Sequence, residues 1–343
     1  MERPTTRQVN DVRAARPRRL AFSVAVLLPL LLVTVLLGVR LGSVALDLPA
    51  FFGGLFCREG YETESLILYS IRLPRVLGAL LAGVGLSLSG LLLQSVTDNA
   101  LAGPSIIGVN AGAGFLQVIF LRFFPTALLL LPFASMGGAF LATLMILFCA
   151  GRTGASKSAL ILAGVALSSV LSAGISCFTL IDDDLLSAYN AFSVGGLAGV
   201  SLRMLIVPAI VIAVVLVTAM ILSPRLSLLL LGDTSASSLG LHPRRMRFIA
   251  VILASAAAGA AVSFAGLLGF VGLIVPHIAR ALVGHRIERL LPITVMLGGM
   301  TVILADMLGR VLAAPTEIPV GIVMSMIGAP FLLFLLFRHR ASG

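Results

Sequence analysis

The sequence predicts an all-α membrane protein with about ten transmembrane helices, and three observations support this prediction. Of its 343 residues, 59% are hydrophobic and only 11% are charged, whereas soluble chains average roughly 45–50% apolar and about 25% charged residues. The mean hydropathy is +1.12, and the apolar residues form long blocks separated by short polar segments. Because one helix needs roughly 20 apolar residues to cross a bilayer, the chain has room for about ten spans.

The first apolar block, Leu20–Val39, contains no charged residue and follows a polar segment, residues 1–19, that carries six arginines. A secretory signal peptide is the alternative interpretation, but its apolar region would be only about 7–15 residues long. We therefore expect a retained first span after a cytoplasmic N-terminal tail. The Arg18-Arg19 pair also resembles a twin-arginine signal.

The remaining apolar blocks follow in order along the chain. The glycines and Pro276 of AGLLGFVGLIVPHIAR, residues 265–280, favour a short eighth helix within or beside this stretch. The other spans from the second to the tenth are predicted at about Leu66–Val96, Leu101–Phe120, Ala127–Ala150, Ala159–Leu180, Met204–Leu222, Phe248–Phe264, Ile293–Leu312 and Val320–Phe337.

The connections are short and polar. An outer loop opens with IDDD at 181–184, and residues 185–200 are expected to hold a short re-entrant or interfacial helix. The longest inner loop is 223–247, and GHRIERLLP at 284–292 is expected to form an inner turn. Residues 20–337 are thus expected to form a single transmembrane domain, followed by a cytoplasmic tail at 338–343.

The distribution of Lys and Arg residues predicts the orientation of the chain. Seventeen of the 24 lie in segments predicted inside and seven in segments predicted outside, as the positive-inside rule requires when both termini are cytoplasmic. The net charge of +10 therefore reflects topology. Nucleic acid is not an expected partner, because the basic residues form no stripe among polar residues. We expect a multi-pass protein of the bacterial plasma membrane, surrounded by membrane lipid.

The sequence offers no catalytic, cofactor or metal site. The three cysteines and four histidines have no ligand spacing. The segment GRTGASKS at 151–158 resembles a phosphate loop, but residue 156 is Ser where the pattern needs Lys, and membrane spans flank it instead of a buried strand. We therefore expect no ATPase in this chain, so that a partner or an ion gradient must supply the energy.

Two features inside the spans have simple explanations. Gly108 and Gly112 form a GxxxG pair, which ordinary packing of membrane helices explains. Asp306 is the one acid deep in a predicted span and is therefore a candidate functional residue. Arg310 follows one helical turn later, so an ion pair near the outer surface is the simpler account.

Four long segments, in matching order and spacing, resemble the FecCD family, the permeases of iron–siderophore, haem and cobalamin ABC importers. They are RLPRVLGALLAGVGLSLSGLLLQSVTDNALAGPSIIGVNAGAGF at 72–115, LGDTSASSLGLHPRRMR at 231–247, GLLGFVGLIVPHIARALVGH at 266–285 and ADMLGRVLAAPTEIPVGIVMSMIGAPFLLFLL at 305–336. The resemblance implies a type II ABC importer permease that moves an iron chelate. A ferric siderophore is the first expectation, followed by haem and then cobalamin.

The resemblance also implies partners. Two permease chains, as a homodimer or a paralogous heterodimer, would form a central path above two cytoplasmic ABC ATPases, which carry the ATP and Mg. An extracytoplasmic binding protein would deliver the substrate. A secondary transporter driven by an ion gradient is the alternative, but it would need midplane carboxylates, broken helices or an internal repeat, and the sequence shows none of these clearly.

The resemblance assigns roles to three groups of residues. Asn99 and Leu101 match an inner gate after the second span, where this chain has Asn-Ala-Leu instead of the usual Asn-Pro-Leu, which frees the backbone. Arg72, Arg75 and Arg310 match arginines that face acidic residues of the binding protein, with headgroup snorkelling as the alternative. The ATPase coupling loop, which is otherwise a solvated basic loop, matches at Gly232, Asp233, Thr234, Ala236, Gly240 and Leu241.

Overall fold

The computed structural model describes residues 6–42, 46–97, 99, 102–104, 108–152 and 157–340, and within these residues the regular structure is entirely helical. The long helices are α1 (Thr6–Arg40), α4 (Leu73–Thr97), α5 (Val109–Phe123), α6 (Leu131–Arg152), α7 (Lys157–Ile181), α9 (Leu202–Leu229), α11 (Pro243–Ala265), α12 (Val271–Val283), α13 (Ile287–Leu312) and α14 (Val320–Arg340). The short ones are α2 (Leu48–Leu55), α3 (Glu62–Leu66), η1 (Ile67–Arg72), η3 (Leu128–Leu130), α8 (Asp183–Val194) and α10 (Asp233–Ser238).

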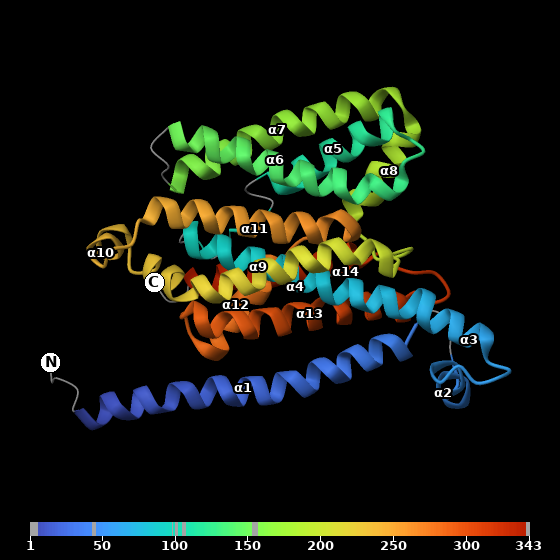
Figure 1. The fold of residues 1–343 in the computed structure, drawn as a ribbon, viewed down its shortest axis with the longest axis horizontal. Helices are drawn as coiled ribbons and strands as arrows, with labels where there is room; N and C mark the ends of the chain where they lie inside the picture. Colours follow the sequence, from blue (N-terminus) through green and yellow to red (C-terminus); the bar gives the residue numbers. More distant parts are fainter. Residues whose placement is uncertain are drawn as a thin grey trace.

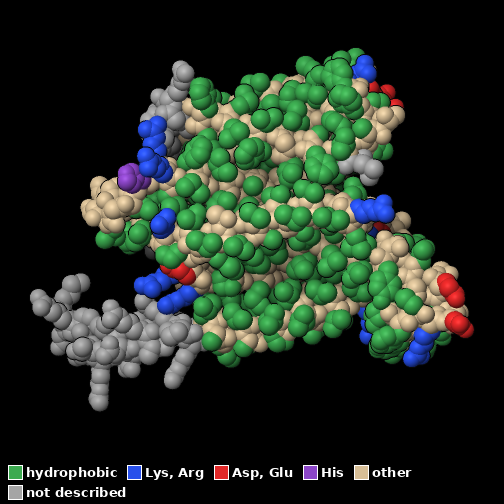
Figure 2. Space-filling model, viewed as in Figure 1, with side chains coloured by type: hydrophobic (Ala, Val, Ile, Leu, Met, Phe, Trp, Pro, Cys, Tyr) green, Lys and Arg blue, Asp and Glu red, His purple; other side chains and the backbone are tan. Residues whose placement is uncertain are grey.

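The helices confirm the predicted membrane architecture. In the described part of the chain, seven helices are long and apolar enough to cross a bilayer, and three shorter apolar helices, α5, α12 and α14, stand beside them. Figure 2 shows large hydrophobic side chains over the middle of the visible face, with charged side chains gathered towards its two ends. A surface of this kind is stable in a bilayer, because lipid tails are as apolar as the side chains that they touch.

The helix α4 occupies the centre of the bundle. It contacts α11, α12, α13 and α9, and 83% of the apolar window that includes it is buried, compared with 11% for α1 and 17% for α7. In Figure 1, α5, α6, α7 and α8 lie together on one side of these central helices, and α1 lies on the opposite side. The chain therefore has a buried core helix and two peripheral layers.

Glycines permit the close packing of α4. A Cβ atom added to Gly83 would lie 2.1 Å from the carbonyl oxygen of Gly298 on α13, and one added to Gly90 would lie 1.8 Å from that of Gly272 on α12. Real side chains do not approach backbone so closely, so only glycine permits these helix pairs to touch. Small residues at helix interfaces have this role in membranes, where burial of apolar surface gives no driving force.

The helix α5 meets α6 through the same kind of contact, which involves Gly112 but not Gly108 of the GxxxG pair. Gly112 packs directly against Gly138 of α6. Gly108 instead precedes the helix as its N-cap, with φ of 66° in the left-handed region, where glycine is favoured. The two glycines therefore have different functions and do not form one packing motif.

Several helix boundaries differ from the prediction. The first span begins at Leu20 as predicted, although its helix already begins at Thr6. By contrast, α9 continues to Leu229, and α13 begins at Ile287, within the segment 284–292 for which the sequence predicts a turn. Hydropathy locates only the apolar part of a helix, whereas hydrogen bonding continues into polar flanks. The third span begins at Val109 and not near Leu101; Leu101 itself lies outside the described residues.

The segments 185–200 and 265–280 both contain helices. The helix α8 occupies most of 185–200, and the carboxylate of Asp182 accepts hydrogen bonds from the backbone N–H groups of Asp184 and Leu185, which is a standard N-cap. The helix α12 is the predicted short eighth helix. Phe270 and Gly266, which flank the connection from α11 to α12, both have positive φ, so the chain turns sharply there.

The adjacent glycines of α6 provide a test of the close packing. We expect Gly138→Ala to destabilise the protein by about 1–3 kcal/mol, because its Cβ would meet the Gly112 carbonyl oxygen at 2.1 Å and overpacking has a cost of this size. Gly137→Ala is the matched control, since nothing lies within 4 Å of the added carbon. The measurement is the thermal unfolding midpoint in detergent, and equal midpoints for the two variants would contradict the packing.

Candidate functional sites at the two ends of the bundle

The sequence-predicted site residues divide between two ends of the helix bundle. One end carries α10 and is called here the α10 end; the other carries α2, α3 and α8 and is called the α8 end (Figure 1). On the face shown in Figure 2, Lys and Arg side chains lie at both ends, and most of the visible acidic side chains lie at the α8 end. On this face the two ends therefore differ mainly in their acidic side chains.

At the α10 end, the predicted coupling loop forms the short helix α10, which lies between two glycines with positive φ. Gly232 precedes it with φ of 89° and Gly240 follows it with φ of 80°, so the chain can reverse direction on either side of the helix. Ala236 is 0% exposed, and its backbone carbonyl accepts hydrogen bonds from the N–H groups of Leu239, 3.2 Å away, and Leu241, 3.0 Å away. This side of α10 anchors the element to the bundle.

The other side of α10 is free to meet a partner. Thr234 and Ser237 are exposed, and Leu239 is 61% exposed. An ion pair between Asp233 and Arg247 ties the start of α10 to α11. The loop thus presents a short exposed surface on a base fixed to both α9 and α11.

At the α8 end, four charged side chains form a buried network. Arg75 of α4 donates from Nε to both carboxylate oxygens of Asp306, at 3.0 and 3.2 Å. Arg310 places its Nε 3.0 Å from the second of these oxygens. The Nη1 of Arg75 lies 2.6 Å from Glu317, on the connection between α13 and α14. The carboxylate of Asp306 is therefore shared by two guanidinium groups, and its side chain is only 1% exposed.

Two arginines also cap the last turn of α1. Arg310 donates hydrogen bonds to the carbonyl oxygens of Leu41, at 2.8 Å, and Gly38, at 3.1 Å. Arg72 donates to those of Val39, at 3.2 Å, and Arg40. The final carbonyls of a helix have no partner within it, and guanidinium donors satisfy them here. The network therefore joins the ends of α1, α4 and α13.

This placement differs from the expectation for the three arginines. They are 4%, 7% and 2% exposed at positions 72, 75 and 310 respectively, so they do not project outward as free charges. They line a pocket of about 110 Å³ together with Gly42, Ile67, Ile71 and Glu317. Contact with a binding protein stays a prediction, and any such contact has to enter this pocket.

The predicted ion pair between Asp306 and Arg310 is confirmed as a contact, but it is part of a larger group than the sequence indicates. Arg75 lies 231 residues from Asp306 along the chain, so no local spacing could identify it as a partner. The one signal in the sequence is the presence of arginines in segments predicted outside, against the trend of the positive-inside rule. Three of these seven arginines, Arg72, Arg75 and Arg310, make the internal contacts described above.

The predicted gate is only partly described. Asn99 follows the end of α4, and its backbone carbonyl accepts a hydrogen bond from the N–H of Ala102, 3.1 Å away. Leu101 lies outside the described residues, so the gate stays a prediction. Near this segment, Gln94 donates a hydrogen bond across to the carbonyl oxygen of Gly272, 3.1 Å away, which fixes the end of α4 against α12.

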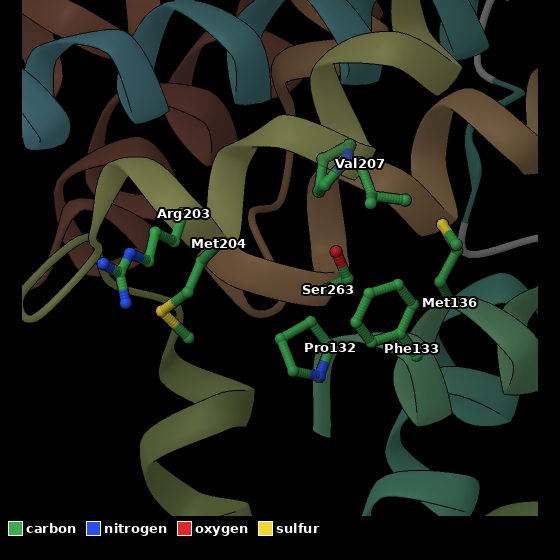
Figure 3. A pocket seen from close by; sticks show the side chains of 8 residues that line it. Pro132, Phe133, Met136, Arg203, Met204, Val207 and Ser263 are labelled. Atoms are coloured by element: carbon green, nitrogen blue, oxygen red, sulfur yellow. The ribbon is translucent and has the colours of Figure 1, made fainter. Parts of the chain in front are cut away.

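One small apolar pocket lies away from both groups of residues. It has a volume of about 80 Å³ between α6, α9 and α11. Figure 3 shows Phe133, Met136 and Met204 around it, with the hydroxyl of Ser263 nearby and Arg203 pointing away from the other labelled side chains. Its lining is too apolar to recognise a charged substrate. Among the described residues, no group of three or more His, Cys, Asp or Glu side chains could hold a metal ion.

Comparison with known protein families identifies the type of fold. Residues 30–338 match the model of the FecCD transport family. A solved structure described as the inward-facing conformation of a metal-chelate type ABC transporter is similar, with a TM-score of 0.82 and 30% sequence identity over 94% of this chain and 99% of that chain.

Characterised relatives extend the same similarity. The Fe(3+)-citrate import system permease protein YfmE of Bacillus subtilis is 33% identical over 94% of this chain and 96% of its own length. The ferric enterobactin transport system permease protein FepD of Escherichia coli is 35% identical over 94% of this chain and 97% of its own. The vitamin B12 import system permease protein BtuC of Vibrio cholerae is 33% identical over 81% of this chain and 85% of its own.

The buried network leads to a prediction about stability. Asp306→Asn should destabilise the protein by about 3–5 kcal/mol, because it leaves two buried guanidinium groups without their shared carboxylate. Glu317→Gln is the control: its side chain is 31% exposed, so the loss should be about 1 kcal/mol or less. Thermal unfolding in detergent measures both variants, and similar midpoints would show that Asp306 does not hold the network together.

Proposed function

This chain belongs to the FecCD transport family and is the membrane permease subunit of an ABC importer, and we propose that it imports a ferric siderophore by ATP-driven transport. The observation that carries the proposal is the match of the family model to residues 30–338, almost the whole bundle. Relatives named for Fe(3+)-citrate and ferric enterobactin support an iron chelate as the first substrate class, whereas a relative named for vitamin B12 supports cobalamin as an alternative. Haem and then cobalamin follow as alternatives.

A partner must supply the energy for this transport. The segment that resembles a phosphate loop, residues 151–158, lacks the required Gly-Lys-Ser/Thr sequence. A secondary transporter would couple transport to ions through midplane carboxylates, but Asp306 is engaged by Arg75 and Arg310 at the α8 end. These observations favour two ABC ATPase subunits, which bind ATP and Mg, over an ion gradient.

The α10 end is the proposed docking surface for the ATPases. Six arginines lie where α9 ends and where α11 and α13 begin, at this end of the bundle: Arg225, Arg244, Arg245, Arg247, Arg286 and Arg289. The positive-inside rule therefore favours a cytoplasmic position for it, together with both termini. The helix α10 has one anchored and one exposed side, and it contacts both α9 and α11. Closure of the ATPases could thus be transmitted to two spans as a rigid-body movement.

A second permease chain is proposed to pack beside α7. The main contacts of α7 in this chain are with α5, α6 and α8, and only 17% of its apolar window is buried. Ser169, Ser172 and Ser176 lie exposed at helical spacing along it. The hydroxyls of Ser169 and Ser176 donate to backbone carbonyls of α7, but their oxygens can still accept hydrogen bonds from water. This face therefore suits the wall of a water-filled path between two permease chains, identical or paralogous.

The α8 end is proposed to receive the extracytoplasmic binding protein, which selects the substrate. The pocket formed by Arg72, Arg75 and Arg310 has about 110 Å³ of space, enough for one acidic side chain. A carboxylate from the binding protein would join the existing network there. Charge pairing of this kind sets orientation and the rate of encounter more than the affinity alone.

Uptake in liposomes tests the proposed function. Liposomes are prepared with this chain and the ATPase subunits, and they receive the binding protein and a radiolabelled ferric siderophore. They should accumulate the siderophore only when ATP is present on the side of the membrane that the ATPases face. Uptake that persists without any ATPase would refute the importer and favour the secondary transporter.

Substitution of Ala236 tests the coupling helix. Ala236→Glu should release the ATPase from the purified complex, because an unpaired carboxylate cannot remain at a site with 0% exposure. Burial of such a charge costs several kcal/mol, so α10 should detach from α9 and α11. Ala198→Glu makes the same change at an exposed position outside α10 and should retain the ATPase. Equal retention of the ATPase by both variants would mean that α10 is not the coupling element.

Substitution of Arg72 tests docking of the binding protein. Arg72→Gln should weaken association by at least about tenfold at low salt, because loss of one member of a buried charge pair has a large cost. Arg203→Gln, which removes an exposed arginine at the same end, is the control. Because Arg72 also caps α1, thermal unfolding is measured in parallel. Unchanged affinity in a folded Arg72→Gln protein would reject this docking role.

A further inference from the structure

A large pocket lies at the α10 end, apart from α10 itself. It is formed where the last residues of α9 meet the turn between α12 and α13, and its volume is about 870 Å³. Neither the predicted coupling residues nor the arginine network contribute to it. Its position at the ends of three membrane helices puts it near the boundary between lipid and water.

One part of the pocket is strongly basic. Arg225 comes from α9, and Arg286 and Arg289 come from the start of α13, with His285 beside them. The single acid of the lining, Glu288, already accepts a hydrogen bond from the hydroxyl of Ser227, 3.0 Å away. Three arginines therefore face one carboxylate that is already bonded, and the lining has a net positive charge.

The start of α13 adds to this positive potential. The helix begins at Ile287, and its N-cap residue, Arg286, makes no side-chain capping hydrogen bond. Of the first N–H groups, that of Ile287 is bound by the Ser227 hydroxyl, 3.1 Å away. A helix N-terminus carries partial positive charge that favours an anion, and here it acts in addition to the arginines.

The other part of the pocket is apolar and open. Leu228, Val283 and Pro224 contribute to the lining, together with Leu230 and Leu231, which are 40% and 59% exposed. Leucines exposed beside arginines are suited to a ligand with a charged head and a hydrocarbon tail. An anion without a tail would leave these leucines in water.

We propose that this pocket binds the headgroup of an anionic phospholipid of the inner leaflet, with an acyl chain against the leucines. The phosphate would lie among Arg225, Arg286 and Arg289, as in other basic pockets between membrane helices on the cytoplasmic side. The site does not depend on which substrate the importer moves. It gives the chain a preference for lipid charge at the junction of α9, α12 and α13.

Native mass spectrometry of the purified full-length chain tests this site. The chain is titrated with phosphatidylglycerol and, separately, with phosphatidylcholine that has the same acyl chains. We expect at least one phosphatidylglycerol to bind about tenfold more tightly than phosphatidylcholine. Arg286→Gln with Arg289→Gln should weaken its binding by about 25-fold, since each arginine near anionic lipid contributes a factor of about five.

Two controls distinguish this pocket from a general attraction of lipid to surface arginines and from a site for free phosphate. Arg203→Gln with Arg245→Gln removes the same charge from exposed positions outside the pocket and should change the binding less than twofold. Inorganic phosphate at millimolar concentration should not displace the bound lipid. Equal binding of the two lipids, equal effects of the two double variants or displacement by phosphate would each overturn the proposal.

The ATPase provides one more comparison. If the Arg286→Gln, Arg289→Gln variant loses the ATPase subunit from the purified complex but still binds phosphatidylglycerol like the unchanged protein, the pocket is a protein interface and the lipid proposal is overturned. Retention of the ATPase together with weaker lipid binding supports it.

Discussion

The rest of the structure depends on how closely α4 approaches its neighbours. A membrane helix gains no free energy from hiding apolar side chains from lipid tails, so helix packing must come from direct contact. Gly83 and Gly90 have no side chain at the points where α4 contacts the backbones of α13 and α12. With α4 fixed at the centre, α11, α12 and α13 surround it, and α1 and the α5–α8 group add on opposite sides (Figure 1).

Polar groups inside the bundle also hold helices together. Gln94 reaches across to the backbone of α12, and Arg72 and Arg310 saturate the last carbonyls of α1. An unsatisfied backbone group is costly in lipid, where water cannot replace a missing partner. The buried charges of Arg75, Asp306 and Arg310 are therefore compatible with the membrane because each has a partner in this chain.

Much of the fold could be predicted from the sequence because membrane spans obey a simple rule of length and hydropathy. The prediction located α8 and α12, although not their exact extent. It was wrong at Ile287, where α13 already begins within a segment that was predicted to form a turn. It could not place Arg75 beside Asp306, because that contact joins distant segments through the tertiary packing of α4 and α13. Nor could it find the pocket at Arg286, because the α9 and α13 arginines come together only when both helices are in place.

The capping of α1 has a mechanical consequence. Its last turn is fastened by Arg310 of α13 and by Arg72, which leads directly into α4, and Arg75 connects α4 to α13 through Asp306. These contacts link the three helices at one end of the bundle, so none of them can tilt there without the others. This end of α1, α4 and α13 would therefore move as one rigid unit in any change of conformation.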